Sequence, residues 1–83
     1  MPDEILERVK KVTGKILNID PSEISDTADF VKDLGAESVQ SIELVAAFEE
    51  EFDIEMDEDE ALEVKTIDKA VEFIKKTMEE QHK

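Results

Sequence analysis

One serine, where an irregular segment meets a predicted helix, is the best candidate for covalent chemistry in this sequence. Ser38 follows the short run Leu-Gly-Ala-Glu at residues 34–37 and precedes an apolar residue, Val39. Its position predicts a helix N-cap, whose side-chain oxygen accepts an N–H of the first turn. The position also permits a modified serine, because a phosphodiester there lies against unpaired N–H groups at the positive end of the helix dipole. The local residues leave both interpretations open.

Patterns typical of catalysis or metal binding are missing from the sequence. His82 is the only histidine and lies in the polar tail, and two glycines are too few for a nucleophile elbow or a phosphate-binding loop. The acidic run that begins at Asp53 does not fit a calcium-binding EF-hand, because position six is Glu58 rather than Gly and position twelve is Val64 rather than Glu. We therefore expect neither an enzyme nor a dedicated metal site.

Acidic residues are concentrated in the middle of the chain. The 83 residues contain 24 Asp and Glu against 10 Lys and Arg, which gives a net charge of −14. No basic residue lies between Lys32 and Lys65, whereas 13 acids fall within residues 33–64. This run is either a solvated helix face or an anionic docking surface for basic partners. In both cases the surface repels nucleic acid, so we expect no nucleic-acid partner.

Length and composition predict one small domain spanning residues 1–83. Apolar residues make up 40% of the chain and occur in periodic clusters, which is typical of a folded domain rather than a disordered one. The absence of cysteine excludes disulfides. No apolar run approaches the ~20 residues of a membrane span, and the N-terminus lacks the apolar stretch of a signal peptide. We therefore expect a cytoplasmic protein with no membrane span.

The first half of the chain predicts one long helix followed by a long loop. Apolar residues recur at helical spacing over residues 3–18, although Gly14 weakens that helix by up to ~1 kcal/mol relative to Ala. Residues 20–23 predict a short helical turn that begins with a capping Asp and a proline. Residues 25–37 predict a loop of a length that is often functional. Its expected apolar anchors are Phe30, Val31 and Leu34.

The second half predicts two longer helices and a short one between them. Residues 38–52 form the first, with a buried stripe of Ile42, Val45, Phe48 and Phe52. Residues 57–62 predict one or two helical turns. Thr66 is the expected cap of the last helix, and residues 79–83 are expected to fray. The inner face of that helix should consist of Ile67, Ala70, Val71, Ile74 and Met78. The predicted fold class is therefore all-α, a small four-helix bundle of three main helices and one short helix.

The residues around Ser38 resemble the acyl carrier protein family. The resemblance combines residues 34–39 with Ile-Glu-Leu-Val at 42–45 and Phe-Glu-Glu-Glu-Phe at 48–52, and it extends from about Ile5 to Ile74. It implies that Ser38 receives 4′-phosphopantetheine from coenzyme A. Acyl intermediates would then travel as thioesters on that arm to enzymes of fatty acid, lipid or specialised biosynthesis, and the acyl chain would slip between the helices.

An exposed face beside the serine is the expected partner surface. Val39, Glu43, Ala46 and Glu50 follow helical spacing on the side away from the predicted buried stripe. The resemblance implies that acidic residues of this region meet basic patches on a phosphopantetheinyl transferase and on acyl-transferring or synthase enzymes. The residues that match this role are Glu37, Glu43, Glu49, Glu50 and Glu58. We expect the carrier itself to be a monomer.

The sequence departs from the family pattern at a few positions. Glu37 replaces the usual Asp before the serine, Val39 replaces the usual Leu after it, and Ala46 replaces a larger apolar residue. Met56-Asp57 replaces the common aliphatic-proline step. These differences favour a carrier that serves a dedicated pathway. They also leave two alternatives open: an unmodified, carrier-like acidic interaction subunit, and a carrier of aminoacyl or polyketide cargo.

Overall fold

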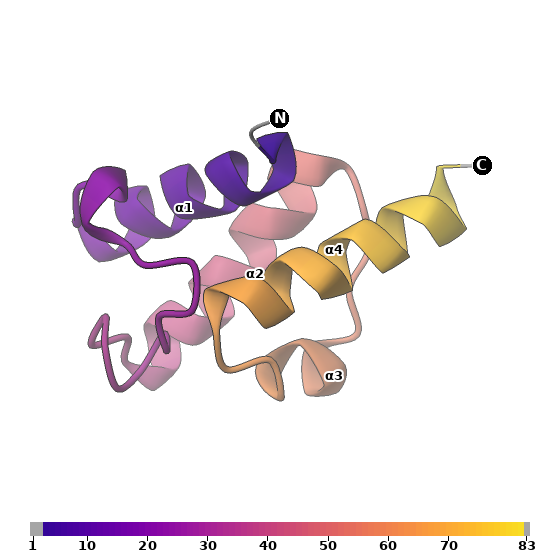
Figure 1. Cartoon of the computed structure of the whole chain (residues 1–83). Coiled ribbons are helices and arrows are strands. Elements are labelled where there is room, and N and C mark those ends of the chain that lie inside the picture. Colours follow the sequence, from indigo (N-terminus) through magenta and orange to yellow (C-terminus); the bar gives the residue numbers. More distant parts are fainter. Residues whose placement is uncertain (1–2, 83) are drawn as a thin grey trace.

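The computed structural model describes residues 3–82 and has the predicted all-α architecture (Figure 1). Three long helices enclose the core, with α1 packed against both α2 and α4, and the short α3 packed against α2. The helical elements in chain order are α1 (Glu4–Leu17), η1 (Pro21–Glu23), α2 (Ser38–Phe52), α3 (Glu58–Leu62) and α4 (Ile67–Gln81). These bounds confirm the helices expected from the sequence, to within one or two residues at most ends.

Aspartates cap several of these elements. The Asp3 carboxylate accepts the N–H groups of Ile5 and Leu6 at 3.1 and 3.2 Å, and Asp57 accepts the N–H of Glu60 at 3.2 Å. The predicted cap of the short turn is confirmed, because the Asp20 carboxylate accepts the N–H of Ser22 at 2.9 Å. Such side chains satisfy N–H groups that a helix leaves unpaired at its start.

Thr66 is the N-cap residue of α4, as predicted, but its hydroxyl does not cap an N–H. It donates instead to the carboxylate of Asp68, which also accepts the N–H of Lys69 at 3.0 Å. The bond from the Thr66 hydroxyl, followed by the Lys69 N–H, lowers the pKa of Asp68 below its usual value. The start of α4 is therefore held by an aspartate one residue inside the helix.

The buried stripe of α2 differs from the predicted one. Phe48 and Phe52 are buried as expected and Val45 is half-buried, but the Ile42 side chain is 51% exposed and Leu44 is buried in its place. Leu44, Phe48 and Phe52 repeat every four residues, so they share one face. Ile42 lies on the helix edge, and because α2 is apolar over more than half its circumference, hydropathy alone did not identify the inward face.

The end of α4 is bonded to the connection between α2 and α3, so the predicted fraying of residues 79–82 is wrong. The Gln81 amide exchanges two hydrogen bonds of 2.8 Å with the backbone N–H and C=O of Glu55. The His82 ring lies 2.6 Å from the carbonyl oxygen of Asp53. These partners are distant in sequence, which explains why composition did not reveal them. Lys83 lies outside the described residues.

Candidate functional site

The loop between η1 and α2 is folded by its own aspartates. The Asp29 carboxylate accepts the N–H groups of Val31 and Lys32 at 2.9 and 2.8 Å. The carboxylate of Asp33 in turn accepts the N–H of Asp29 at 2.7 Å. The bond from the Lys32 N–H is the largest cause that lowers the pKa of Asp29. Gly35 has φ +72°, a left-handed conformation that glycine adopts without steric cost. The chain thus turns sharply just before α2.

The same loop is tied to the start of α4. The N–H of Phe30 bonds to the carbonyl of Lys65, and the N–H of Ile67 bonds to the carbonyl of Ala28, both at 2.9 Å. Phe30 is buried and Leu34 is half-buried, as predicted for apolar anchors, whereas the Val31 side chain is 56% exposed. The Val31 prediction is therefore wrong. These bonds hold the approach to α2 against a second helix, so the start of α2 has a fixed position.

Ser38 is the first helical residue of α2 and not its N-cap. The N-cap residue is Glu37, whose extended backbone (φ −88°, ψ 167°) precedes the helix and whose N–H is accepted by the Gln40 side chain at 2.9 Å. The capping interpretation of Ser38 is therefore wrong by one position. The Ser38 side chain is exposed, and its hydroxyl makes no hydrogen bond with any residue from 3 to 82.

This geometry fits a phosphodiester on Ser38. The hydroxyl lies at the surface beside the first turn of α2, whose first N–H groups have no partner within the helix. These groups and the positive end of the dipole of a 15-residue helix favour an anion at this place. No side chain has to move to admit a substituent, because the side chains of Glu37, Ser38 and Val39 are all exposed.

The predicted partner surface is exposed beside Ser38. Val39 is the most exposed large apolar residue described, at 69%, and Glu43, Ala46 and Glu50 are exposed on the same helix. Glu58 is exposed in the first turn of α3. Glu49 differs from the other predicted residues because it is half-buried and its carboxylate accepts the N–H of Met56 at 2.9 Å.

Sequence reasoning missed further exposed apolar residues in this region. Ile42 on α2, Leu62 on α3 and Val31 in the loop all have exposed side chains. Hydropathy suggests burial for Ile42 and Val31. Leu62 lies two residues after a run of four acids, Asp57 to Glu60, in a helix too short to show a period. The signal that was available for Ile42 is its offset from the four-residue repeat of Leu44 and Phe48.

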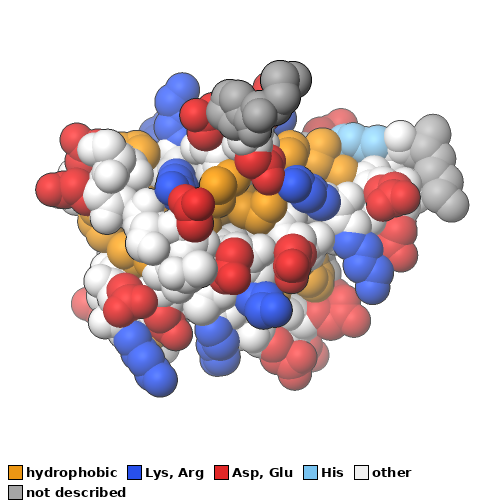
Figure 2. All heavy atoms as spheres, in the orientation of Figure 1, with side chains coloured by type: hydrophobic (Ala, Val, Ile, Leu, Met, Phe, Trp, Pro, Cys, Tyr) orange, Lys and Arg blue, Asp and Glu red, His pale blue; other side chains and the backbone are white. Residues whose placement is uncertain are grey.

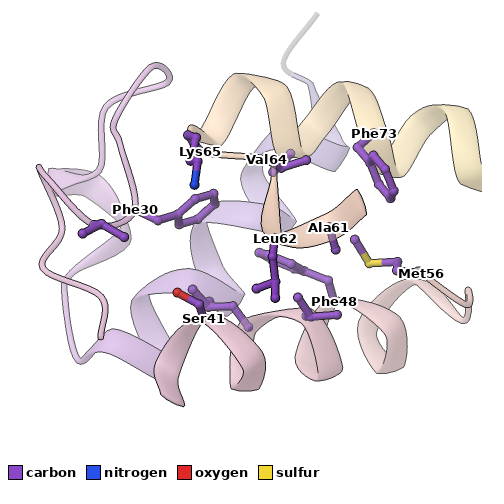
Figure 3. A pocket seen from close by; sticks show the side chains of 13 residues that line it. Phe30, Ser41, Phe48, Met56, Ala61, Leu62, Val64, Lys65 and Phe73 are labelled. Atoms are coloured by element: carbon purple, nitrogen blue, oxygen red, sulfur yellow. The ribbon is translucent and has the colours of Figure 1, made fainter. Parts of the chain in front are cut away.

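An apolar cavity of about 90 Å³ lies between α2, α3, α4 and the loop (Figure 3). Leu44 and Phe48 of α2, Ala61 of α3 and Ala70 and Phe73 of α4 supply much of its wall. The full set of lining residues is completed by Phe30, Val31, Ser41, Val45, Met56, Leu62, Val64 and Lys65. Such a site suits a small apolar group, since concave sites lined by aliphatic and aromatic side chains bury most of a ligand.

The described residues contain neither a metal-binding cluster nor a membrane-spanning helix. Among residues 3–82, no three His, Cys, Asp or Glu side chains are placed to hold one metal ion. None of the helices in this part of the chain has the length and apolar character needed to cross a membrane.

Comparison with known proteins identifies the family. Residues 7–74 match the family model described as a phosphopantetheine attachment site. The acyl carrier protein of Caulobacter vibrioides is 49% identical over 71 residues, which cover 86% of this chain and 91% of that protein. The acyl carrier protein of Phenylobacterium zucineum is 45% identical over 75 residues, covering 90% of this chain and 95% of that protein. The matched region includes the loop, Ser38, α2 and the cavity, and the chain belongs to the phosphopantetheine-bearing acyl carrier protein family.

Proposed function

We propose that this chain carries acyl groups on a 4′-phosphopantetheine arm joined to Ser38. The observation that carries the proposal is an exposed serine hydroxyl, without a hydrogen-bond partner in residues 3–82, at the first position of α2 within the matched region. When bound, the arm supplies a thiol that holds acyl groups as thioesters. On attachment, the Ser38 oxygen would lose its proton and bond to the pantetheine-side phosphorus of coenzyme A, whose pyrophosphate bond would break to release adenosine 3′,5′-bisphosphate. The first turn of α2 would stabilise the phosphodiester anion left on Ser38.

The elements around Ser38 hold the attachment point of the arm in place and provide an apolar cavity for the cargo. The hydrogen bonds of Asp29 and the backbone bonds between Phe30 and Lys65 hold the start of α2 in place. The cavity begins one helical turn further along α2, at Ser41, so an apolar site lies close to the attachment point of the arm that carries the acyl chain. In this proposal residues 1–83 act as a single carrier domain that catalyses no reaction itself.

We further infer that the partners are enzymes with basic surfaces, namely a phosphopantetheinyl transferase and acyl-transferring or synthase enzymes. The exposed face of Val39, Glu43, Ala46 and Glu50 offers apolar contact and negative charge beside the serine. Glu37, just before α2, and Glu58, in the first turn of α3, are further exposed acids, while Glu49 contributes charge from a partly buried position. Exposed ion pairs contribute only ~0–1 kcal/mol each, so binding should be weak, fast and sensitive to salt, as a monomeric cytoplasmic shuttle requires.

The attachment site is tested by measuring intact mass after incubation with coenzyme A and a broad-specificity phosphopantetheinyl transferase. The wild-type chain should gain the mass of one phosphopantetheine group, and Ser38→Ala should gain none. Ser41→Ala is the matched control, because it removes the next serine of α2 and should still be modified. A wild-type chain that gains no mass would favour the unmodified interaction subunit instead, and a modified Ser38→Ala variant would move the site elsewhere.

A further inference from the structure

The cavity has one polar end. Of the 13 side chains that line it, only Ser41 and Lys65 carry polar groups. Figure 3 shows both on the side where Phe30 lies, with the Lys65 amino group directed toward the Phe30 ring. Met56 and Phe73 lie at the opposite side of the cavity. The wall therefore changes from polar to apolar along its length.

The polar end is the end nearest to Ser38. Ser41 lies three residues after Ser38, which places it one turn along the same helix face. Lys65 is held near this end through its backbone, because its carbonyl accepts the N–H of Phe30 at 2.9 Å. Phe30 is itself bonded to Ala36, two residues before Ser38, at 2.8 Å. If the arm on Ser38 lies back along this turn of α2, its thioester reaches the polar end, and an acyl chain that enters there meets Ser41 and Lys65 before Met56 and Phe73.

The Lys65 ammonium has hydrogen-bonding capacity that residues 3–82 do not use. It makes no ion pair or hydrogen bond within this part of the chain, which is also true of Lys11, Lys15, Lys32 and Lys76, and the residue is exposed. Of these five lysines, only Lys65 lines the cavity. The Ser41 hydroxyl already donates to the Glu37 carbonyl, at a long 3.3 Å. An ammonium has three donors and no acceptor, so Lys65 can recognise an oxygen on the cargo but contributes nothing to a purely aliphatic chain.

The cavity is also small. An engineered protein cavity of about 150 Å³ holds one benzene molecule, so 90 Å³ suits a group of fewer than six carbons. Leu62 and Met56 line the cavity wall from the short α3 and the segment before it.

We propose that Lys65 determines cargo specificity, and that this carrier holds short acyl chains with an oxygen acceptor close to the thioester in preference to saturated chains of equal length. This inference rests on the proposed function. The ammonium donates to the oxygen at the polar end of the cavity, while the remaining carbons contact the apolar end. The acceptor is a hydroxyl, a carbonyl or a carboxylate oxygen, and the test distinguishes these sources.

The experiment measures how well the folded carrier protects its thioester from hydroxylamine. Butyryl, 3-hydroxybutyryl, acetoacetyl and malonyl forms are prepared from the corresponding coenzyme A thioesters, and intact mass verifies loading. Each half-life is divided by that of the same acyl group on free pantetheine, which removes intrinsic reactivity. The variants are Lys65→Met, which keeps an apolar stem without the charge, Lys65→Arg, which keeps the charge, and the control Lys69→Met, which removes a lysine that does not line this cavity.

In the wild type, at least one oxygenated form should be protected about three- to tenfold better than the butyryl form, the size expected for a partly exposed charge-assisted hydrogen bond. Lys65→Met should reduce this ratio to about one. Lys65→Arg should give a ratio between one and the wild-type value, and Lys69→Met should leave the wild-type ratio unchanged. Protection of the malonyl form alone would identify the acceptor as a carboxylate.

A wild-type ratio near one, or a ratio that survives in Lys65→Met, would overturn the proposal and leave Lys65 as a lysine whose stem covers the cavity while its charge stays in water. If the chain takes up no phosphopantetheine, no acyl form can be prepared. That outcome would refute the proposed function, and it is distinguishable from a failure of the Lys65 proposal alone. Circular dichroism melts of each variant show whether the fold is intact.

Discussion

Gly14 lowers the helix propensity of α1 but permits the close packing of the chain that follows this helix. Inside a helix, glycine is less favourable than alanine by ~1 kcal/mol. In this structure, however, Gly14 is buried where η1 approaches α1. A Cβ at this position would lie 2.4 Å from the carbonyl oxygen of Ile19 and 3.2 Å from a ring carbon of Pro21. The absent side chain therefore lets the chain fold back directly after α1.

We predict that Gly14→Ala destabilises the protein although alanine is the better helix former. The backbone oxygen of Ile19 can move only with its segment, and overpacking of this kind costs ~1–3 kcal/mol, more than the propensity gain. The melting temperature should fall by roughly 5–15 °C. Lys11→Ala, at an exposed position of the same helix, should change stability by less than ~0.5 kcal/mol. A Gly14→Ala protein that melts higher than the wild type would contradict this prediction.

Residues differ in how far the sequence alone predicts their roles. The motif around Ser38 predicts that serine as the attachment site, because residue types at fixed spacing are a local property, and this assignment stays a prediction. The cap assignment was wrong by one position, since the backbone angles of Glu37 determine where α2 begins. Lys65 had no recognisable signal, because its place in the cavity depends on a backbone bond to Phe30, 35 residues earlier in the chain. Contacts between distant segments are what the sequence left undetermined.

Among the elements, α2 has a buried face and an exposed face on opposite sides. Leu44, Phe48 and Phe52 face the core, and Glu43 and Ala46 face the solvent. The exposed face was predicted from spacing, and its exposure agrees with that prediction. The exposure of Ile42 was harder to predict, because α2 is apolar over more than half its circumference and only the offset of Ile42 from the repeat of Leu44 and Phe48 marks it. The exposed edge adds an apolar strip to the acidic face.

We predict that Glu43→Lys slows association with a basic partner without disturbing the fold. The residue is exposed and makes no ion pair within residues 3–82, so stability should change by less than ~0.5 kcal/mol. Charges at the rim of an interface act mainly on the encounter rate, and the loss should therefore shrink as salt rises. Ala46→Leu should change the dissociation rate instead, because it adds apolar contact without charge.

The measurement is stopped-flow binding to the phosphopantetheinyl transferase at two salt concentrations. Glu79→Lys, an equal charge reversal near the end of α4, is the control and should retain nearly the wild-type rate. Equal slowing by both variants would indicate that only net charge matters, and unchanged rates for Glu43→Lys would exclude α2 as the recognition face.

The whole molecule has an uneven charge distribution. Lys, Arg, Asp and Glu are interspersed on the face formed by α1 and α4 (Figure 2). By contrast, of the 13 acids within residues 33–64, only Glu51 forms an ion pair with a described residue, at 2.8 Å from Arg8. The same Arg8 lies over the ring of Phe52 with 4.4 Å between the guanidinium carbon and the ring centroid. Arg8 of α1 thus offsets negative charge at the end of α2, and the other acids repel one another.

We predict that salt stabilises this protein. Raising the ionic strength from about 0.01 to 0.15 M shortens the screening length from about 30 to 8 Å, which weakens repulsion among the acids. Salt also weakens the four ion pairs present in residues 3–82, but exposed pairs contribute only ~0–1 kcal/mol each, so relief of repulsion should dominate. The melting temperature should therefore rise with salt, and divalent cations should raise it at lower concentrations.

Two variants of equal net charge separate this local effect from total charge. Replacing Glu50, Glu60 and Glu63 by Gln removes three exposed acids from the central run, whereas replacing Glu23, Glu79 and Glu80 by Gln removes three exposed acids outside it. The first variant should have the higher melting temperature at low salt and the smaller response to added salt, because its removed charges lie among the most crowded acids. Equal responses would mean that net charge alone governs stability, and a melting temperature that stays flat or falls with salt would contradict the prediction itself.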